Sequence, residues 1–139
     1  IVGNNTDVVT RQISKNLISK VESHPPMPSN DIQPLYSKSK IFILPSGSEG
    51  APNVLTESLC CGCSQVIAPE LLHLSYIEAN GDGSLAPKAT PAEFCKAILL
   101  EAEKWETKQY DPISISQKYC SKFHLSKIAN QIENFFKGI

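Results

Sequence analysis

Two carboxylates bracket a turn of small residues in the middle of this chain of 139 residues. Glu49 and Glu57 are separated by the segment Gly-Ala-Pro-Asn-Val-Leu-Thr. A carboxylate accepts hydrogen bonds from neutral hydroxyl groups and stabilises positive charge that develops on a nearby carbon atom. It repels a phosphate, because like charges repel. The pair therefore favours a hydroxyl-rich ligand beside the carboxylates, with any phosphate held by other groups.

A strand, a turn and a helix are expected to position the two carboxylates. The apolar run at residues 41–45 predicts a buried parallel strand by its length and β-branched content. A helix is expected to begin at Pro52, because a fixed φ suits the first helical position and the missing N–H costs nothing there. The first free N–H groups of this helix, with the positive end of its dipole, predict a phosphate site. These are the N–H groups of Asn53, Val54 and Leu55.

A diphosphate at this helix start would place a carboxylate on either side of it. Glu57 is suited to a neutral diol such as a ribose. Glu49, at the carboxyl end of the strand, is suited to sugar hydroxyls or to positive charge on an anomeric carbon. Gly47 and Gly50 leave room for close approach of a ligand. The alternative stays open, because this unit is common and a glutamate on a helix is often simply solvated.

The segment from residue 44 to residue 68 reads LPSGSEGAPNVLTESLCCGCSQVIA. It resembles the E-x7-E segment of retaining glycosyltransferases of the family 4 type, which have the GT-B fold. Residues 31–39 resemble the helix before the first strand of this segment, and residues 80–85 resemble the loop that leads to the next strand. The resemblance covers roughly residues 1–105.

The resemblance implies a role for each matching position. Glu49 would be the catalytic residue that contacts the donor sugar, and Glu57 would bind the ribose of the nucleotide. The remaining donor-binding positions would be Ser46, Gly50, Ala51, Asn53, Val54 and Leu55. No cofactor and no metal are expected, in agreement with the absence of an Asp-x-Asp pair from the sequence.

The implied function is transfer of a hexose from a UDP- or GDP-sugar to a saccharide or lipid-linked acceptor. The Arg and Lys pair with which the family clamps the diphosphate has no counterpart, since the single arginine, Arg11, lies on an expected outer helix. We therefore expect the chain to be the donor-binding part of a larger enzyme, inactive alone, whose acceptor-binding domain precedes residue 1. Two alternatives remain: a non-catalytic nucleotide-binding module, and a nucleotide-sugar epimerase of GT-B architecture.

Alternating strands and helices predict an α/β fold, with a Rossmann-like parallel sheet flanked by helices and incomplete at its start. Residues 1–105 would form the donor-binding domain, and residues 106–139 would add two helices packed on it. Other helices are expected at 6–20, 29–37, 70–79 and from Pro91, and strands at 21–24 and 65–68. The apolar face of the last helix, from Leu125 to Phe136, is expected to cover the sheet; the alternative is exposure that favours self-association.

Composition excludes several classes of protein. A hydrophobic content of 41% and a charged content of 19% exclude a disordered chain, and a net charge of −1 gives no basis for nucleic-acid binding. No apolar run reaches the length of a membrane span and no signal peptide is visible, so a cytoplasmic location is expected. Family analogy adds peripheral association of the intact enzyme with the inner face of the membrane. The five cysteines predict free thiols and a reducing compartment, because Cys60-x-x-Cys63 lacks a second ligand pair.

Overall fold

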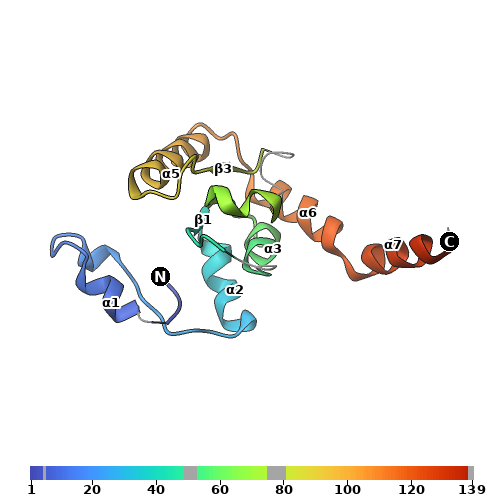
Figure 1. The fold of residues 1–139 in the computed structure, drawn as a ribbon, viewed down its shortest axis with the longest axis horizontal. Coiled ribbons are helices and arrows are strands. Elements are labelled where there is room, and N and C mark those ends of the chain that lie inside the picture. Colours follow the sequence, from blue (N-terminus) through green and yellow to red (C-terminus); the bar gives the residue numbers. More distant parts are fainter. Residues whose placement is uncertain (5, 49–52, 75–80, 138–139) are drawn as a thin grey trace. The chain divides into compact units, whose positions relative to one another are not determined.

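The computed structural model describes residues 1–4, 6–48, 53–74 and 81–137 (Figure 1). The chain divides into two units, Ile1–Pro34 and Leu35–Ile139. The predicted donor-site positions all belong to the second unit. The expected division between residues 105 and 106 stays a prediction.

The first unit contains short helices where one long helix was expected. α1 (Thr6–Arg11) ends early, and a separate 3₁₀ turn, η1 (Ile18–Lys20), follows it. The prediction of a helix over 6–20 is therefore wrong. Val8 and Val9 are 48% and 46% exposed, so the expected inner face is not buried. β-Branched residues lose rotamer freedom in a helix, and without burial nothing offsets that loss.

The expected strand at 21–24 is reduced to a single parallel bridge between Val2 and His24. The His24 N–H donates to the Ile1 carbonyl at 2.8 Å, and the Gly3 N–H donates to the His24 carbonyl at 3.1 Å. The two segments do pair, but over one residue each. α2 (Ser29–Lys38) then begins where the sequence predicts a helix.

The second unit is built on a parallel sheet of strand order β1-β2-β3. Its strands are β1 (Ile41–Leu44), β2 (Ser64–Ile67) and β3 (Gly83–Leu85). The helices are α3 (Asn53–Cys60), η2 (Pro69–Leu74), α5 (Pro91–Glu106), α6 (Pro112–Phe123) and α7 (Leu125–Lys137). The prediction of an α/β fold with a Rossmann-like parallel sheet flanked by helices is confirmed.

The third strand was not predicted, because residues 80–85 resemble a loop. Gly83–Leu85 contains no β-branched residue, and pairing with β2 makes it a strand. The Gln65 N–H donates to the Asp82 carbonyl at 3.2 Å, and the Ala86 N–H donates to the Ile67 carbonyl at 3.0 Å. The expected helix at 70–79 is the 3₁₀ helix η2 as far as Leu74, and residues 75–80 lie outside the described residues.

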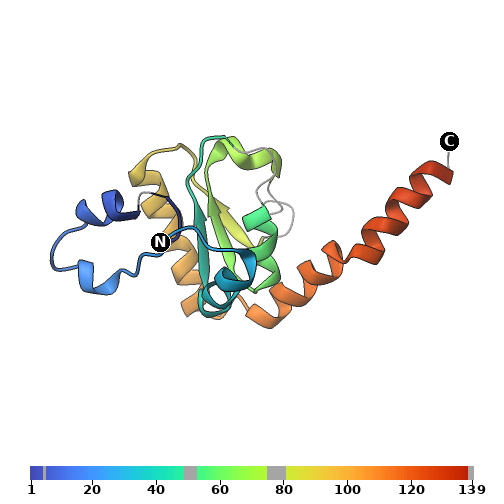
Figure 2. The ribbon, with the colours of Figure 1, turned by 90° about the horizontal axis from the view of Figure 1, so that it is seen from below.

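Alternate residues of β2 point to opposite layers of helices. Val66 packs with Ala97 and Ile98 of α5, whereas Ile67 packs with Leu55 of α3. Figure 2 shows α3 and α5 on the two sides of the sheet. The sheet is therefore covered on both faces, as expected for parallel strands.

α6 packs on the outer side of α3 through the buried residues Leu59, Ile115 and Tyr119. α7 has no buried residue, and Leu125 is 81% exposed. The prediction that its apolar face covers the sheet is therefore wrong, because that face contacts no core within the described residues. The alternative of an exposed apolar face holds.

Candidate functional site

The carboxyl ends of the three strands form one edge of the sheet, which is where open parallel sheets bind ligands. Ser46 follows β1 at this edge and is half-buried. α3 begins at the same edge, because Leu55 in its first turn packs with Ile67, the last residue of β2, and with Leu44, the last residue of β1. The structure describes the strand and the helix of the strand-turn-helix arrangement expected from the sequence, and both are present at this edge.

The predicted binding residues of α3 differ in exposure. Asn53 is exposed, Val54 is half-buried and Leu55 is only 3% exposed. The Leu55 side chain belongs to the core, so only its backbone can serve a ligand. N–H groups in the first turn of a helix have no acceptor within the helix and are available to an anion. The predicted residues Glu49, Gly50 and Ala51, and the expected helix start at Pro52, lie outside the described residues.

Glu57 lies one turn after Asn53 on α3 and is half-buried. The sheet and α6 contact a different stripe of this helix, formed by Leu55, Ser58 and Leu59. Side chains on a helix lean toward its amino terminus, so Glu57 leans toward the start of α3. A carboxylate in this position can bind the part of a ligand next to an anion held at the helix start.

Tyr36, which the sequence analysis did not single out, lies close enough to Glu57 for the two groups to interact electrostatically. Its side chain is buried and packs edge-on against Phe42 of β1, with ring centroids 5.7 Å apart. Its hydroxyl has no hydrogen-bond partner among the described residues. Burial, and then the negative charge of Glu57, raise the pKa of Tyr36 to about 12, so the hydroxyl stays protonated at neutral pH. Glu57 therefore lies near the buried, uncharged side chain of Tyr36.

A buried glutamine fixes α3 to the sheet. Gln65 of β2 is 1% exposed, and its Nε2 donates to the Leu55 carbonyl at 2.5 Å and to the Ser58 hydroxyl at 2.8 Å. The Ser58 hydroxyl donates in turn to the Leu55 carbonyl at 3.1 Å. These bonds set the depth of α3 against β2, and hence the position of its first turn. The signal in the sequence is a polar residue within an apolar strand, but its partners cannot be read from the sequence.

Replacing Gln65 with leucine tests this attachment. Gln65→Leu replaces the amide with an apolar side chain of similar size. The Ser58 hydroxyl then loses the hydrogen bond that it accepts from Gln65 Nε2. We expect the free energy of unfolding to fall by about 1–3 kcal/mol, because two buried hydrogen bonds are lost and each is worth about 0.5–1.5 kcal/mol. Urea denaturation followed by circular dichroism measures it. The control is Gln117→Leu at an exposed position on α6, which should change stability by no more than about 0.5 kcal/mol. Equal effects of both substitutions would contradict the assigned role.

A second polar cluster lies near the amino end of β3, at the end of the sheet opposite the candidate site. Glu101 of α5 is 0% exposed; its Oε1 accepts from the Ser84 hydroxyl at 2.5 Å and from Lys104 Nζ at 2.7 Å. Burial and the adjacent Glu101 raise the pKa of Tyr110, whose hydroxyl donates to the Gly81 carbonyl at 2.9 Å. A cavity of about 230 Å³ opens beside this cluster. The cluster stabilises the contact of α5 with β3 and lies away from the carboxyl ends of the strands.

Comparison with known families decides the identity of this fold. Residues 1–112 match the family described as Glycosyl transferases group 1. The chain belongs to this family. The matched range contains the whole segment from Ser46 to Glu57, and no curated protein matches the chain.

Membership of glycosyl transferases group 1 supports glycosyl transfer and implies a sugar donor and an acceptor as substrates. It favours neither the non-catalytic module nor the epimerase. Within the described residues, no group of three or more histidine, cysteine, aspartate or glutamate side chains could hold a metal ion. No helix in the described part of the chain has the length and apolar character needed to cross a membrane.

Proposed function

We propose that this group 1 glycosyl transferase chain binds a nucleotide-sugar donor at the carboxyl edge of its sheet. The donor would be a UDP- or GDP-hexose, and the acceptor a saccharide or a lipid-linked saccharide bound by a second domain of the GT-B type. The observation that carries the proposal is the position of α3, whose first turn is held at the ends of β1 and β2 by Leu55 and Gln65.

The diphosphate of the donor would bind the backbone N–H groups in the first turn of α3. A helix dipole stabilises an anion there by about 0.3–1 kcal/mol, and by up to about 2 kcal/mol where the site is partly buried. The Glu57 carboxylate would accept hydrogen bonds from the ribose hydroxyls, each worth about 1.5–3 kcal/mol when the acceptor is charged. Binding of the diphosphate by backbone N–H groups at the positive end of the helix dipole would need no metal.

The transfer would proceed with retention of configuration at the anomeric carbon. The acceptor hydroxyl oxygen bonds to the anomeric carbon while the bond from that carbon to the diphosphate oxygen breaks. The hydroxyl proton passes to the departing diphosphate. Attack and departure on the same face of the sugar preserve its configuration. Glu49 would position the sugar and stabilise the positive charge that develops on the anomeric carbon.

Calorimetric titration of the chain with UDP, GDP and their hexose conjugates tests donor binding. We expect one of the two nucleotides to bind in preference, and its hexose conjugate to bind at least as tightly, because the sugar adds contacts. Circular dichroism of the same sample confirms that the chain is folded. A folded chain that binds neither nucleotide at millimolar concentration would contradict the proposal that this chain holds the donor.

A further inference from the structure

Two cysteines from distant parts of the sequence meet where α6 crosses the end of α3. Cys60 is the last residue of α3, and Cys120 lies on α6. The Cys120 thiol donates to the Cys60 carbonyl oxygen at 3.6 Å, and the two side chains are close enough to interact electrostatically. The Ser116 hydroxyl donates to that carbonyl at 2.6 Å and lies 3.9 Å from Cys120 Sγ. Cys120 is therefore held against the backbone of Cys60, and Ser116 contacts both residues.

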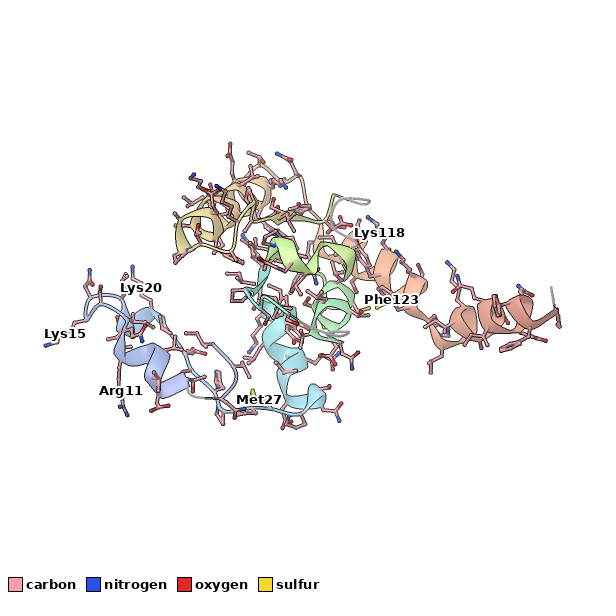
Figure 3. The ribbon with its side chains drawn as sticks, viewed as in Figure 1. Arg11, Lys15, Lys20, Met27, Lys118 and Phe123 are labelled. Atoms are coloured by element: carbon pink, nitrogen blue, oxygen red, sulfur yellow. The ribbon has the colours of Figure 1, made fainter. Side chains whose placement is uncertain are left out.

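The packing around the two thiols keeps the helices close together. Leu59, next to Cys60, is fully buried with Ile115 and Tyr119 of α6. On the other side, a Cβ atom at Gly62 would lie 2.5 Å from the Pro112 carbonyl oxygen, so the turn after α3 abuts the start of α6. Figure 3 shows Lys118 and Phe123 on α6, the helix that packs against α3. A disulfide forms without backbone movement only where the two residues are close, and this packing holds α3 and α6 together around Cys60 and Cys120.

The two thiols differ in accessibility. Cys120 is exposed and can be reached by a small disulfide in solution, whereas Cys60 is half-buried. Burial, and then the neighbouring Cys120, raise the pKa of Cys60 to about 12, so Cys60 remains a thiol at neutral pH. The order of reaction follows: the exposed thiol reacts first, and the half-buried thiol completes the bond.

Among the other three cysteines, Cys61 also lies within electrostatic range of Cys120, but the side chains of Cys61 and Cys63 hydrogen-bond on the α2 side. Cys63 is 0% exposed, and its Sγ donates to the carbonyls of Tyr36 and Ser39 on the α2 side. Cys61 hydrogen-bonds to Ser37, also on that side. Cys95 is exposed on α5, away from the contact of α3 with α6.

We propose that Cys60 and Cys120 are the site of a reversible disulfide that links the end of α3 to α6. The oxidant is a low-molecular-weight disulfide such as oxidised glutathione. The Cys120 thiolate attacks one sulfur of glutathione disulfide, forming a mixed disulfide and releasing one glutathione thiolate. Cys60 gives its proton to the released glutathione thiolate and attacks the Cys120 sulfur, and the second glutathione leaves as a thiolate that takes up the proton lost by Cys120. The two protein thiols lose two electrons and two protons, and both glutathione molecules leave as thiols.

The functional consequence concerns the stability of α3. The helix that begins at the candidate donor site would be tied to α6 at its far end, and the closed loop would restrict the unfolded chain. The inference itself rests on the contact of α3 with α6 and is independent of donor binding.

The experiment incubates the whole chain with oxidised glutathione, blocks the remaining thiols with an alkylating agent and maps the peptides by mass spectrometry. We expect a peptide pair joined through Cys60 and Cys120. The link should be lost in Cys60→Ser and in Cys120→Ser. It should remain in Cys95→Ser, an exposed control on another helix, and in Cys61→Ser, a control for the neighbouring thiol. The oxidised wild-type chain should melt several degrees above the reduced chain, and the melting temperature of Cys120→Ser should not respond to oxidation.

Two results would overturn the inference. One is a stable glutathione adduct on Cys120 as the end product, because it would show that Cys60 does not reach the mixed disulfide. The other is a link that disappears in Cys61→Ser and persists in Cys60→Ser. The Cys120→Ser arm keeps the test valid if substitution at the half-buried Cys60 disturbs folding, since Cys120 is exposed.

Discussion

Gly62→Ala is expected to lower the free energy of unfolding by about 3 kcal/mol, because two separate costs combine at this position. Gly62 has φ +88°, and a side chain in this left-handed region costs about 1–2 kcal/mol. The added Cβ would also lie 2.5 Å from the Pro112 carbonyl oxygen, where backbone rather than a flexible side chain must move. Overpacking of this kind costs about 1–3 kcal/mol. Urea denaturation of the variant and of the wild type measures the sum.

The backbone around Gly62 explains why the glycine is needed. The Cys63 N–H donates to the Ser58 carbonyl and the Gly62 N–H donates to the Leu59 carbonyl, both at 3.0 Å. This pair of bonds is the Schellman arrangement that ends a helix on a left-handed residue. The turn also directs the chain from α3 into β2, so its distortion would displace both elements that frame the candidate site.

Gly81→Ala is the matched control for this prediction. Gly81 also has a positive φ, of +73°, but a Cβ there would meet nothing within 4 Å. Its substitution should cost only the conformational part, about 1–2 kcal/mol. Equal losses at the two glycines would show that the contact with Pro112 contributes nothing and would contradict the explanation.

The parts of the fold that the sequence predicts well are those with local causes. The apolar run at 41–45 predicts β1 because a buried parallel strand carries its own pattern of side chains. α5 begins at Pro91, as predicted, and the Thr90 side chain caps it by accepting from the Glu93 N–H at 3.4 Å. These signals lie within the elements that they define.

The parts that the sequence does not predict depend on distant partners. β3 is a strand because β2 supplies its hydrogen bonds, and the buried Ser84 depends on Glu101 of the following helix. The burial of Gln65 also depends on another element, since its hydrogen-bond partners are on α3. A single sequence shows each polar residue but not the residue that satisfies it. The prediction of a helix over 6–20 is wrong because it also depends on a distant partner. Periodicity alone cannot show whether an apolar helix face packs against a core.

The candidate site divides in the same way. The order of strand β1 and helix α3 and the helical position of Glu57 follow from local signals, and the structure has both. The setting of Glu57 beside the buried ring of Tyr36 does not, because that contact joins α2 to α3. The sugar-binding role of Glu49 and the backbone contacts of Gly50 and Ala51 stay predictions, since these residues lie outside the described part of the chain.

Glu57→Ala is expected to weaken nucleotide binding by about 10- to 100-fold, which corresponds to the loss of one hydrogen bond to a charged acceptor. The physical reason is the position of Glu57 one turn beyond the helix start, beside the proposed diphosphate site, where a carboxylate can accept from the ribose hydroxyls. Calorimetric titration with the preferred nucleotide measures the change. Deoxyribonucleotide analogues sharpen the test, because removal of a ribose hydroxyl should weaken binding to the wild type but not to Glu57→Ala.

Glu49→Ala is the companion substitution, because the two carboxylates are proposed to bind different parts of one donor. Glu49→Ala should leave the affinity for the free nucleotide unchanged and should lower the affinity for the hexose conjugate. Glu57→Ala should lower both affinities by the same factor, since both ligands carry the ribose. If Glu49→Ala instead weakens the binding of free nucleotide and conjugate equally, the division between a sugar-binding and a ribose-binding glutamate is wrong. Diphosphate recognition by α3 would then remain as the basis of donor binding, because it depends on backbone N–H groups that neither substitution removes.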